Sequence, residues 1–484
     1  MTGRLQPATP RGIMEPAVAP RALAAARPES ARAELAALLR LSGPLVGANL
    51  LQMAIAAVDV IFVARLGAVD LAAATLAVFS FNLLMYAIIG LTSAAAPLIA
   101  AELGRRSHAV REVRRSVRMA LWVGAVAAVP MLLILARGET LLLAAGQDAE
   151  VARRAGRFMD VILVALPLGA FAGIMRTAAA ALGRAAWAFA VTAAALAVDI
   201  VANWALVFGH LGAPAMGLVG SALASVIAIA LMAASYVAIF LLDPKLRRYH
   251  LFGRWWRPEW SRFRDIVRIG APIMLTWIAE GSLFGGAAIL MGLIGVNEVA
   301  AHAVALNIAA VAFQFPFGIA QAATIRVGLA FGAGDHAWIT RAGRVALVLG
   351  IGVMALTAGI MWAAPHPLIA AYIDPTLPQN TAVAALALQF LAVAAVFQLV
   401  DGAQAVAAGV LRGLQDTRVP MLVAVLGYWI GGFGTAILLG FWTPLAGVGI
   451  WWGLAAGLAI VAALLLWRWS LRERLGLTSS RPAS

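Results

Sequence analysis

Long apolar runs dominate this sequence and limit what it can fold into. They recur along the chain at lengths of about 20 residues or more, which is the length that an α-helix needs to cross the hydrocarbon core of a membrane. Apolar residues make up 63% of the chain and charged residues 12%, whereas soluble globular proteins have about 45–50% and about 25%. The sequence contains no cysteine. These features exclude a water-soluble protein, a disordered chain and a disulfide scaffold, and they predict an all-α integral membrane protein.

The apolar runs and the Gly, Pro and polar residues between them predict twelve transmembrane helices. Their approximate spans are residues 43–66, 71–102, 117–136, 156–182, 187–209, 216–242, 269–295, 299–331, 342–364, 382–411, 418–440 and 445–467. Several joints, such as residues 67–70 and 295–298, leave almost no loop between neighbouring helices. The 46 glycines agree with this prediction, because membrane helices tolerate glycine better than soluble helices do.

The distribution of basic residues predicts the orientation of the chain. Arg and Lys gather in the cytoplasmic segments of membrane proteins, and Lys245 is the only lysine here. A cytoplasmic N-terminus leaves few basic residues outside, namely Arg65, Arg137, Arg153, Arg154 and Arg157. We therefore expect both termini in the cytoplasm and the protein in the plasma (inner) membrane. Topology and contact with anionic lipids then explain the formal charge of +14, so no nucleic-acid partner is expected.

The two halves of the sequence repeat each other. Pro44 recurs as Pro272, 228 positions later. The same offset pairs Gly67 with Gly295, Asp70 with Glu298, Gly104 with Gly332, and His108 with His336. Farther along, the offset drifts to 230 and pairs residues 214–217 with residues 444–447. Because each half has six helices, both halves enter the membrane in the same sense, and their pseudo-two-fold axis runs along the membrane normal.

The repeat predicts a division into two six-helix lobes with flanking segments. We expect a disordered cytoplasmic tail (1–40), an N-lobe (41–242), a cytoplasmic linker (243–268), a C-lobe (269–470) and a second cytoplasmic tail (471–484). Residues 32–40 have helical potential, and the N-terminal segment lacks the apolar core and cleavage site of a signal peptide.

Four acidic residues lie well inside the predicted spans: Asp59, Asp199, Glu280 and Asp401. A charge near the bilayer centre is so costly that such residues are functional candidates by default. The alternative is that they hydrogen-bond to neighbouring helices and only hold the bundle together. Asp160 lies near the start of a span and is expected at the membrane interface.

Helical spacing gives these acids further candidate partners, because residues three, four and seven apart share a helix face. The secondary candidates are Asn203, four residues after Asp199; Gln52, seven before Asp59; Phe284 and Met291, on the stripe of Glu280; and Gln314, in the segment FQFPFG. Aromatic and Met side chains form adaptable apolar walls, which suit binding without strict shape specificity.

Three prolines are candidate hinges. Pro44 and Pro272 lie at the heads of paired helices, and Pro316 falls inside the eighth helix. A proline inside a helix frees a backbone carbonyl and permits bending, although a static kink is the alternative. Three arginines near the inner ends of spans are expected to anchor the topology by extending to the interface: Arg176, Arg326 and Arg412.

The acids indicate transport of cations and not catalysis. The sequence has no GxxxxGK[ST], HExxH or GxSxG motif, so neither an enzyme nor an ATP-driven pump is expected, and no cofactor either. A carboxylate withdrawn from water can be neutralised by a proton, a sodium ion or an organic cation. Occupancies that exclude one another would couple an ion gradient to substrate movement. No basic residue lies in the matching middle of these helices, which disfavours anionic substrates.

Several segments are similar to those of a known family. PLVGANLLQMAIAAVDVIFVARLG in helix one and LRGLQDTRVPM after helix ten resemble the multidrug and toxic compound extrusion (MATE) family, over about residues 36–470. WIAEGSLFGGAAILMGLIG and FQLVDGAQAVAAGVLRG are similar to its NorM-like branch. The resemblance implies that Glu280 and Asp401 bind the coupling cation, with Na⁺ as one candidate, and that Asp59 matches an acid of the N-lobe. The order Asp199 then Asn203 departs from archaeal-type members, in which the amide precedes the acid.

The leading hypothesis is a secondary active antiporter that exports organic, often cationic amphipathic compounds in exchange for Na⁺ or H⁺ by alternating access of two lobes. The alternatives are a flippase for lipid-linked precursors of the same superfamily, which should show a basic central cavity, and an exporter of metabolites other than drugs. A channel or a membrane scaffold is a third hypothesis, against which the paired halves and buried acids argue. The expected partners are small organic cations or drugs and membrane lipids, and the expected state is a monomer.

Overall fold

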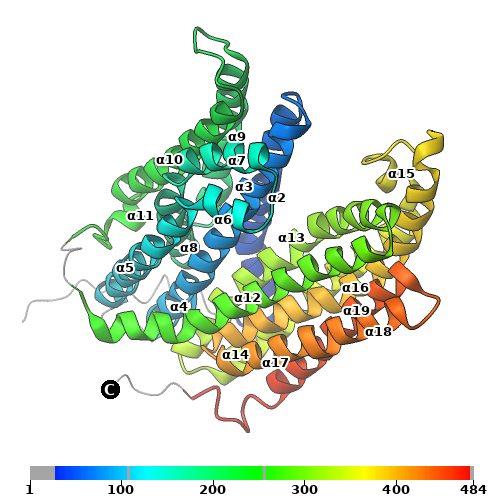
Figure 1. Ribbon diagram of the computed structural model, residues 1–484. Coiled ribbons are helices and arrows are strands. Elements are labelled where there is room, and N and C mark those ends of the chain that lie inside the picture. The colour runs from blue at the N-terminus through cyan, green and yellow to red at the C-terminus, as the bar shows by residue number, and fades with distance from the viewer. Residues whose placement is uncertain (1–27, 106–108, 254–257, 480–484) are drawn as a thin grey trace, which may run out of the picture.

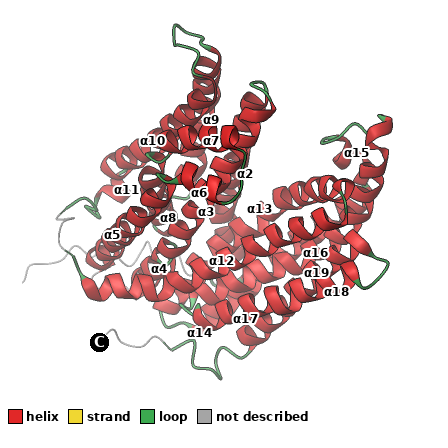
Figure 2. Cartoon of the chain, viewed as in Figure 1, coloured by secondary structure: helices red, strands yellow, loops and turns green. Residues whose placement is uncertain are grey.

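The computed structural model describes residues 28–105, 109–253 and 258–479, and the regular structure within these ranges is entirely helical (Figure 2). The helices of the first half are α2 (Ala31–Ala64), α3 (Ala68–Thr92), α4 (Ala95–Arg105), α5 (Ala109–Leu135), α6 (Gly138–Ala144), α7 (Ala149–Ile162), α8 (Ala165–Ala181), α9 (Ala186–Phe208) and α10 (Gly217–Leu242). The short α11 (Pro244–Arg247) follows them. The helices of the second half are α12 (Trp260–Ile294), α13 (Val296–Gly332), α14 (His336–Ala363), α15 (Pro365–Ala370), η1 (Pro378–Asn380), α16 (Thr381–Gly413), α17 (Arg418–Leu426), the π-helix η2 (Gly427–Phe433), α18 (Gly434–Phe441) and α19 (Ala446–Ser470).

The prediction of twelve spans is confirmed. Within the described ranges, eleven helical segments are long and apolar enough to cross a membrane, and α7 with α8 makes the twelfth if this bent pair is one span. The two helices of that pair meet at an angle of 50°. Pro167 lies in the first turn of α8, where its missing N–H and fixed φ interrupt the helix and account for the break.

The first helix starts earlier than the sequence predicted. α2 begins at Ala31, and the Ser30 hydroxyl caps it by accepting a hydrogen bond from Ala33 N at 3.2 Å. Residues 31–40 are therefore helical, as the helical potential of residues 32–40 indicated, and do not belong to a disordered tail. Residues 1–27 lie outside the described residues. The helix extends because this segment has a capping serine followed by strong helix formers.

The helices form two groups, which we call the N-lobe (α2–α10) and the C-lobe (α12–α19) (Figure 1). They meet where α3 packs against α12 and where α2 and α4 pack against α13. In Figure 1 the groups join in the lower part and diverge toward the top. We call the joined end, which holds the last turns of α4 and α13 and the first turns of α5 and α12, the arginine-rich side.

The contact between the lobes obeys the pseudo-two-fold symmetry of the sequence. A Cβ added to Gly104 would collide with the carbonyl oxygen of Leu329, and one added to Gly332 would collide with that of Ala101. These two contacts exchange when 228 is added or subtracted, because residues 104 and 332, and residues 101 and 329, are repeat mates. The same relation holds for the contacts of Gly90 with Met274 and of Gly318 with Val46. The two lobes thus present the same patch to each other, as a two-fold interface requires.

Candidate functional site

The structure brings the two acids of the C-lobe together. Glu280 lies on α12 and is half-buried, whereas Asp401 lies on α16 and is buried. The two carboxyl groups are close enough to interact electrostatically. Among the described residues, Asp401 Oδ1 has no hydrogen-bond partner. Two carboxylates that share a site shielded from water repel each other, so a cation or a proton bound between them lowers the electrostatic cost.

Two further polar residues of the C-lobe join this pair and were missed in the sequence. Tyr428 lies in the π-helix η2, is fully buried, and interacts electrostatically with Glu280 and Asp401. Gln404, three residues after Asp401 on α16, donates a hydrogen bond from Nε2 to the Tyr428 hydroxyl at 2.6 Å. The sequence could have indicated Gln404, because residues three apart in a helix lie on the same face as each other. Tyr428 lies in a π-helix, a feature that is often found at functional sites.

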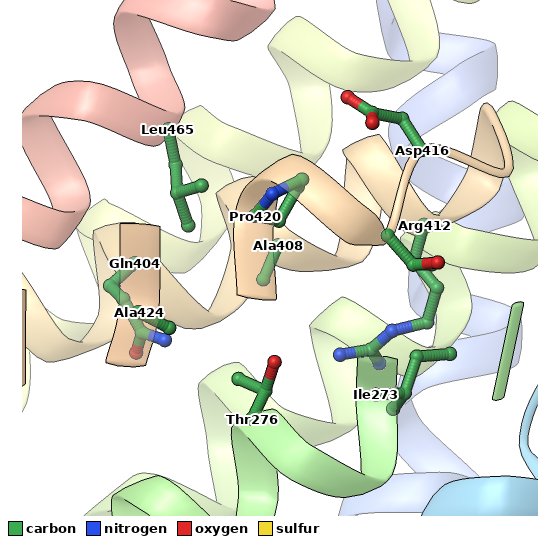
Figure 3. A pocket seen from close by; sticks show the side chains of 10 residues that line it. Ile273, Thr276, Gln404, Ala408, Arg412, Asp416, Pro420, Ala424 and Leu465 are labelled. Carbon is green, nitrogen blue, oxygen red and sulfur yellow. The ribbon is translucent and has the colours of Figure 1, made fainter. Parts of the chain in front are cut away.

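A small cavity of about 20 Å³ approaches this cluster from the arginine-rich side (Figure 3). It lies between α12, α16, α17 and α19, with Thr276, Gln404 and Arg412 among the polar residues of its lining. Such a volume holds about one water molecule. Figure 3 shows Arg412 reaching from α16 toward α12, and its guanidinium interacts electrostatically with Glu280. Arg412 therefore belongs to the polar surroundings of the acid pair.

The N-lobe gathers a second cluster around Asp59. Asn203 Nδ2 donates to Asp59 Oδ1 at 2.9 Å and to Asp199 Oδ2 at 3.2 Å, so that one amide links both acids. Ser225 of α10 donates from its hydroxyl to Asp59 Oδ2 at 3.2 Å. Asp199 and Asn203 are fully buried. Ser225 lies on a different helix from both acids, so helical spacing in the sequence does not connect it with them.

This second cluster has oxygen atoms that are available to bind a cation or a water molecule. Within the described residues, Asp199 Oδ1, Asn203 Oδ1 and the Ser221 hydroxyl are buried without a hydrogen-bond partner. Hard cations prefer carboxylate, amide and hydroxyl oxygens, so this donor set suits a small cation or a bound water. In the described part of the chain, no group of three or more His, Cys, Asp or Glu side chains is placed to hold a metal ion.

Gln52 does not reach the acids of the N-lobe. It lies on an exposed part of α2, where its Oε1 accepts a hydrogen bond from Arg176 Nη1 at 3.2 Å. Asn49 accepts a longer hydrogen bond of 3.5 Å from the same nitrogen. Arg176 is therefore held by polar side chains of α2.

The other secondary candidates lie in the C-lobe, on α12 and α13. Phe284 is half-buried and packs edge-on against Phe397, with ring centroids 6.0 Å apart. Met291 is fully buried in the core. Gln314 donates to the carbonyl of Ala310 in its own helix at 3.1 Å. Their part in substrate binding stays a prediction.

The candidate hinges lie within unbroken helices. α2 continues through Pro44, α12 through Pro272 and α13 through Pro316. Whether they bend during a cycle stays a prediction. Arg326, expected to extend to the interface, is instead buried in the contact between the lobes, where it forms an ion pair with Glu34.

The comparisons with known proteins agree with this architecture. The model of the MatE family matches residues 44–205 and again residues 272–437, and the two matches begin 228 residues apart. "Probable multidrug resistance protein NorM" of Mesorhizobium japonicum is 46% identical over 92% of this chain and 95% of its own length. "Multidrug resistance protein NorM" of Burkholderia vietnamiensis is 37% identical over 93% of this chain and 96% of its own length.

Solved structures share the fold. The crystal structure of the eukaryotic MATE transporter AtDTX14 superposes with a TM-score of 0.79 at 22% identity, covering 93% of this chain and 98% of that one. An outward-facing multidrug resistance MATE family transporter of the MOP superfamily superposes with a TM-score of 0.81 at 20% identity, covering 93% of this chain and 97% of that one. The apolar spans, the repeated halves and these relatives identify a multi-pass membrane protein, and the chain belongs to the MatE family, the multidrug and toxic compound extrusion family that its sequence resembles.

Proposed function

We propose that this protein is a secondary active multidrug exporter, which moves organic, often cationic amphipathic compounds out of the cell in exchange for Na⁺ or H⁺. The observation that carries the proposal is the pair of acid clusters inside the helix bundles, one in each lobe: Glu280 with Asp401, and Asp59 with Asp199. The NorM relatives, named as multidrug resistance proteins, support the substrate class. We infer that the protein is a transporter and not an enzyme.

Coupling would arise from competition for the same negative charge. The carboxylates of Glu280 and Asp401 repel each other unless a proton, Na⁺ or a cationic substrate is bound. A substrate and a coupling ion that both neutralise this pair exclude each other, so that binding of one favours release of the other. We assign Glu280 and Asp401 to coupling and substrate binding, and Asp59 to the N-lobe counterpart.

The arrangement of the lobes supports alternating access. The lobes touch on the arginine-rich side, which the distribution of Arg assigns to the cytoplasm, and they diverge at the other end (Figure 1). We infer an outward-facing state and a plasma-membrane location with cytoplasmic termini. We also infer a monomer that works as two lobes, the N-lobe (α2–α10) and the C-lobe (α12–α19), joined by the segment between α10 and α12. Movement of one lobe against the other would expose the acids to each side in turn.

Two other transport functions remain as alternatives. A flippase for lipid-linked precursors has to hold a pyrophosphate, for which basic residues would be needed. Glu280 and Asp401 give the C-lobe site the opposite charge, although the guanidinium of Arg412 interacts with Glu280. An exporter of metabolites other than drugs would use the same sites, and its substrates would separate it from a drug exporter.

Drug efflux in a pump-deficient strain tests the proposal. Cells that express the protein should lower the accumulation of a fluorescent organic cation, and Glu280→Gln and Asp401→Asn should each abolish this effect at equal expression. Asp160→Asn is the matched control, because Asp160 is an exposed acid of α7 outside both clusters, and it should export like the wild type. Normal export by both cluster variants would refute the assignment of the acids.

A further inference from the structure

Ion pairs cross from one lobe to the other on the arginine-rich side, and two groups of them lie at equivalent places in the repeat. In the first, Glu34 of α2 accepts two parallel hydrogen bonds from Arg326 of α13, from Nε at 2.8 Å and from Nη2 at 2.7 Å. Trp338 Nε1 of α14 donates to the same carboxylate at 3.0 Å, and the guanidinium lies 5.3 Å from the Trp338 ring centroid. The three residues, which we call the first lobe bridge, are exposed by only 0%, 4% and 2%.

The second lobe bridge centres on Arg262, near the start of α12. Its Nη2 donates to Glu102 Oε1 of α4 and to Glu112 Oε2 of α5, both at 3.0 Å. Arg262 comes from the C-lobe and both acids come from the N-lobe. Its side chain is 11% exposed, so this bridge is more accessible to solvent than the first.

The two bridges occupy equivalent places in the pseudo-symmetric molecule. Glu34 and Arg262 are repeat mates, 228 positions apart, yet one is an acid and the other a base. As a result, the N-lobe supplies the carboxylates and the C-lobe supplies the guanidinium groups in both bridges. Because the repeat mates Glu34 and Arg262 carry opposite charges, each of them faces residues of opposite charge in the other lobe. A third contact, in which Arg115 and Arg118 bind Glu259, has the opposite polarity and lies beside the linker.

The energetics of such pairs suit a contact that must break and re-form. Burying an ion pair removes both charges from water, and the gain from pairing often only offsets that loss. The first lobe bridge has favourable geometry, because the bidentate pair and the Trp338 N–H supply partners to both carboxylate oxygens. When the lobes separate, water re-enters and hydrates Glu34 and Arg326. The bridge is therefore stable when closed and has a hydrated alternative when open, which an apolar contact lacks.

We propose that the two lobe bridges are the reversible contacts that hold the lobes together on the arginine-rich side, and that breaking them controls how readily this side opens. The first lobe bridge contributes more, since it has the bidentate geometry and the Trp338 N–H, and since loss of one partner leaves a buried charge unpaired. This inference rests on the proposed alternating access, because it assigns one of the two gates of that cycle to Glu34, Arg326 and Trp338.

A distance measurement between the lobes tests the proposal. The chain has no native cysteine, so Val110→Cys in α5 and Val419→Cys in α17, both at exposed positions near this side, can carry spin labels without a background signal. Double electron–electron resonance in nanodiscs, without substrate or ion gradient, then reports the ratio of open to closed molecules. Asp243→Asn is the matched control, because the ion pair of Asp243 with Arg184 lies within the N-lobe on the same side.

Glu34→Gln and Arg326→Gln should each raise the ratio of open to closed molecules by about tenfold, equivalent to about 1.4 kcal/mol. The double variant should shift the ratio no further than the single variants, since each removes the same pair. Arg326→Lys keeps the charge but loses the bidentate geometry, and should give an intermediate shift. It also serves as the test if a neutral variant does not fold.

A wild-type ratio in these variants, or additive shifts in the double variant, would overturn the proposal, as would an equal shift in Asp243→Asn. The measurement needs neither substrate nor coupling ion. If the variants keep the wild-type ratio of open to closed molecules and the wild type exports normally, the role of the lobe bridges is rejected and the proposed function stands. If the variants shift the distance between the lobes but the wild type exports no substrate, the proposed function is rejected.

Discussion

The close approach of Gly332 to Ala101 makes the contact between the lobes sensitive to a single methyl group. A Cβ at residue 332 would lie 2.7 Å from Ala101 Cα and closer still to its carbonyl oxygen. Carbon atoms in contact prefer about 3.5 Å, so α4 and α13 would have to separate by on the order of 1 Å. Backbone atoms cannot rotate away as a side chain can. Gly332→Ala should therefore weaken the closed contact by about 1–3 kcal/mol, the usual cost of overpacking.

Hydrogen exchange followed by mass spectrometry measures this effect. A loss of 1–3 kcal/mol corresponds to about 5–150-fold, and amides at the ends of α4 and α13 should exchange faster by that factor if they exchange through opening of this contact. The repeat mate Gly104→Ala should give an effect of similar size, because its Cβ would meet the Leu329 carbonyl. Gly359→Ala is the control, since apart from the neighbouring backbone of its own helix nothing in the described structure lies within 4 Å of a Cβ there. Unchanged exchange in Gly332→Ala, or equal acceleration in Gly359→Ala, would refute the close contact as the cause.

Three further predictions concern the clusters and the linker. Tyr428→Phe should lower the free energy of unfolding by about 1–3 kcal/mol, because the buried Gln404 amide loses its partner; thermal unfolding in detergent measures it, and an unchanged Tm contradicts it. Asn203→Ala should cost a similar amount by removing the donor shared by two acids, and an unchanged Tm would place that amide outside the cluster. Burial alone would raise the pKa of Asp243, but hydrogen bonds from Trp187, the Lys245 N–H and Arg184 lower it below 3.8. The ionised Asp243 therefore stabilises the fold above pH 3.8, and this contribution is lost as the pH falls through the lower folded-state pKa; Asp243→Asn should show a smaller loss of Tm with acid, and equal slopes would contradict the shift.

The spans and the repeat were predictable because they depend on properties that are local in sequence. A helix must hold enough apolar residues to cross the membrane, so the number of spans follows from the lengths of the apolar runs. The offset of 228 reappeared in the contacts of Gly104 and Gly332, since equivalent residues of two similar lobes meet around one axis. The meeting of Asp59 with Asp199 and of Glu280 with Asp401 was not predicted from spacing alone, although each acid was a candidate.

The partners of the acids could not be predicted, because they depend on how each helix is rotated about its axis. Ser225 and Tyr428 come from helices whose apolar composition hides which face turns inward. Glu34 was missed for another reason: an Ala-, Pro- and Arg-rich segment has the composition of a tail, and the Ser30 cap that starts its helix is a weak signal. Arg326 has the position of an interfacial anchor, and only its pairing with Glu34 shows otherwise.

The most direct test of the account is uptake of a fluorescent organic cation by proteoliposomes with an imposed Na⁺ gradient or an imposed pH gradient. We expect one of these gradients to drive uptake by the wild type, and uptake to stop when that gradient is dissipated. Glu280→Gln and Asp401→Asn should abolish uptake, whereas Asp160→Asn should not. Uptake that is independent of both gradients, or that persists in both Glu280→Gln and Asp401→Asn, would contradict coupling through these acids.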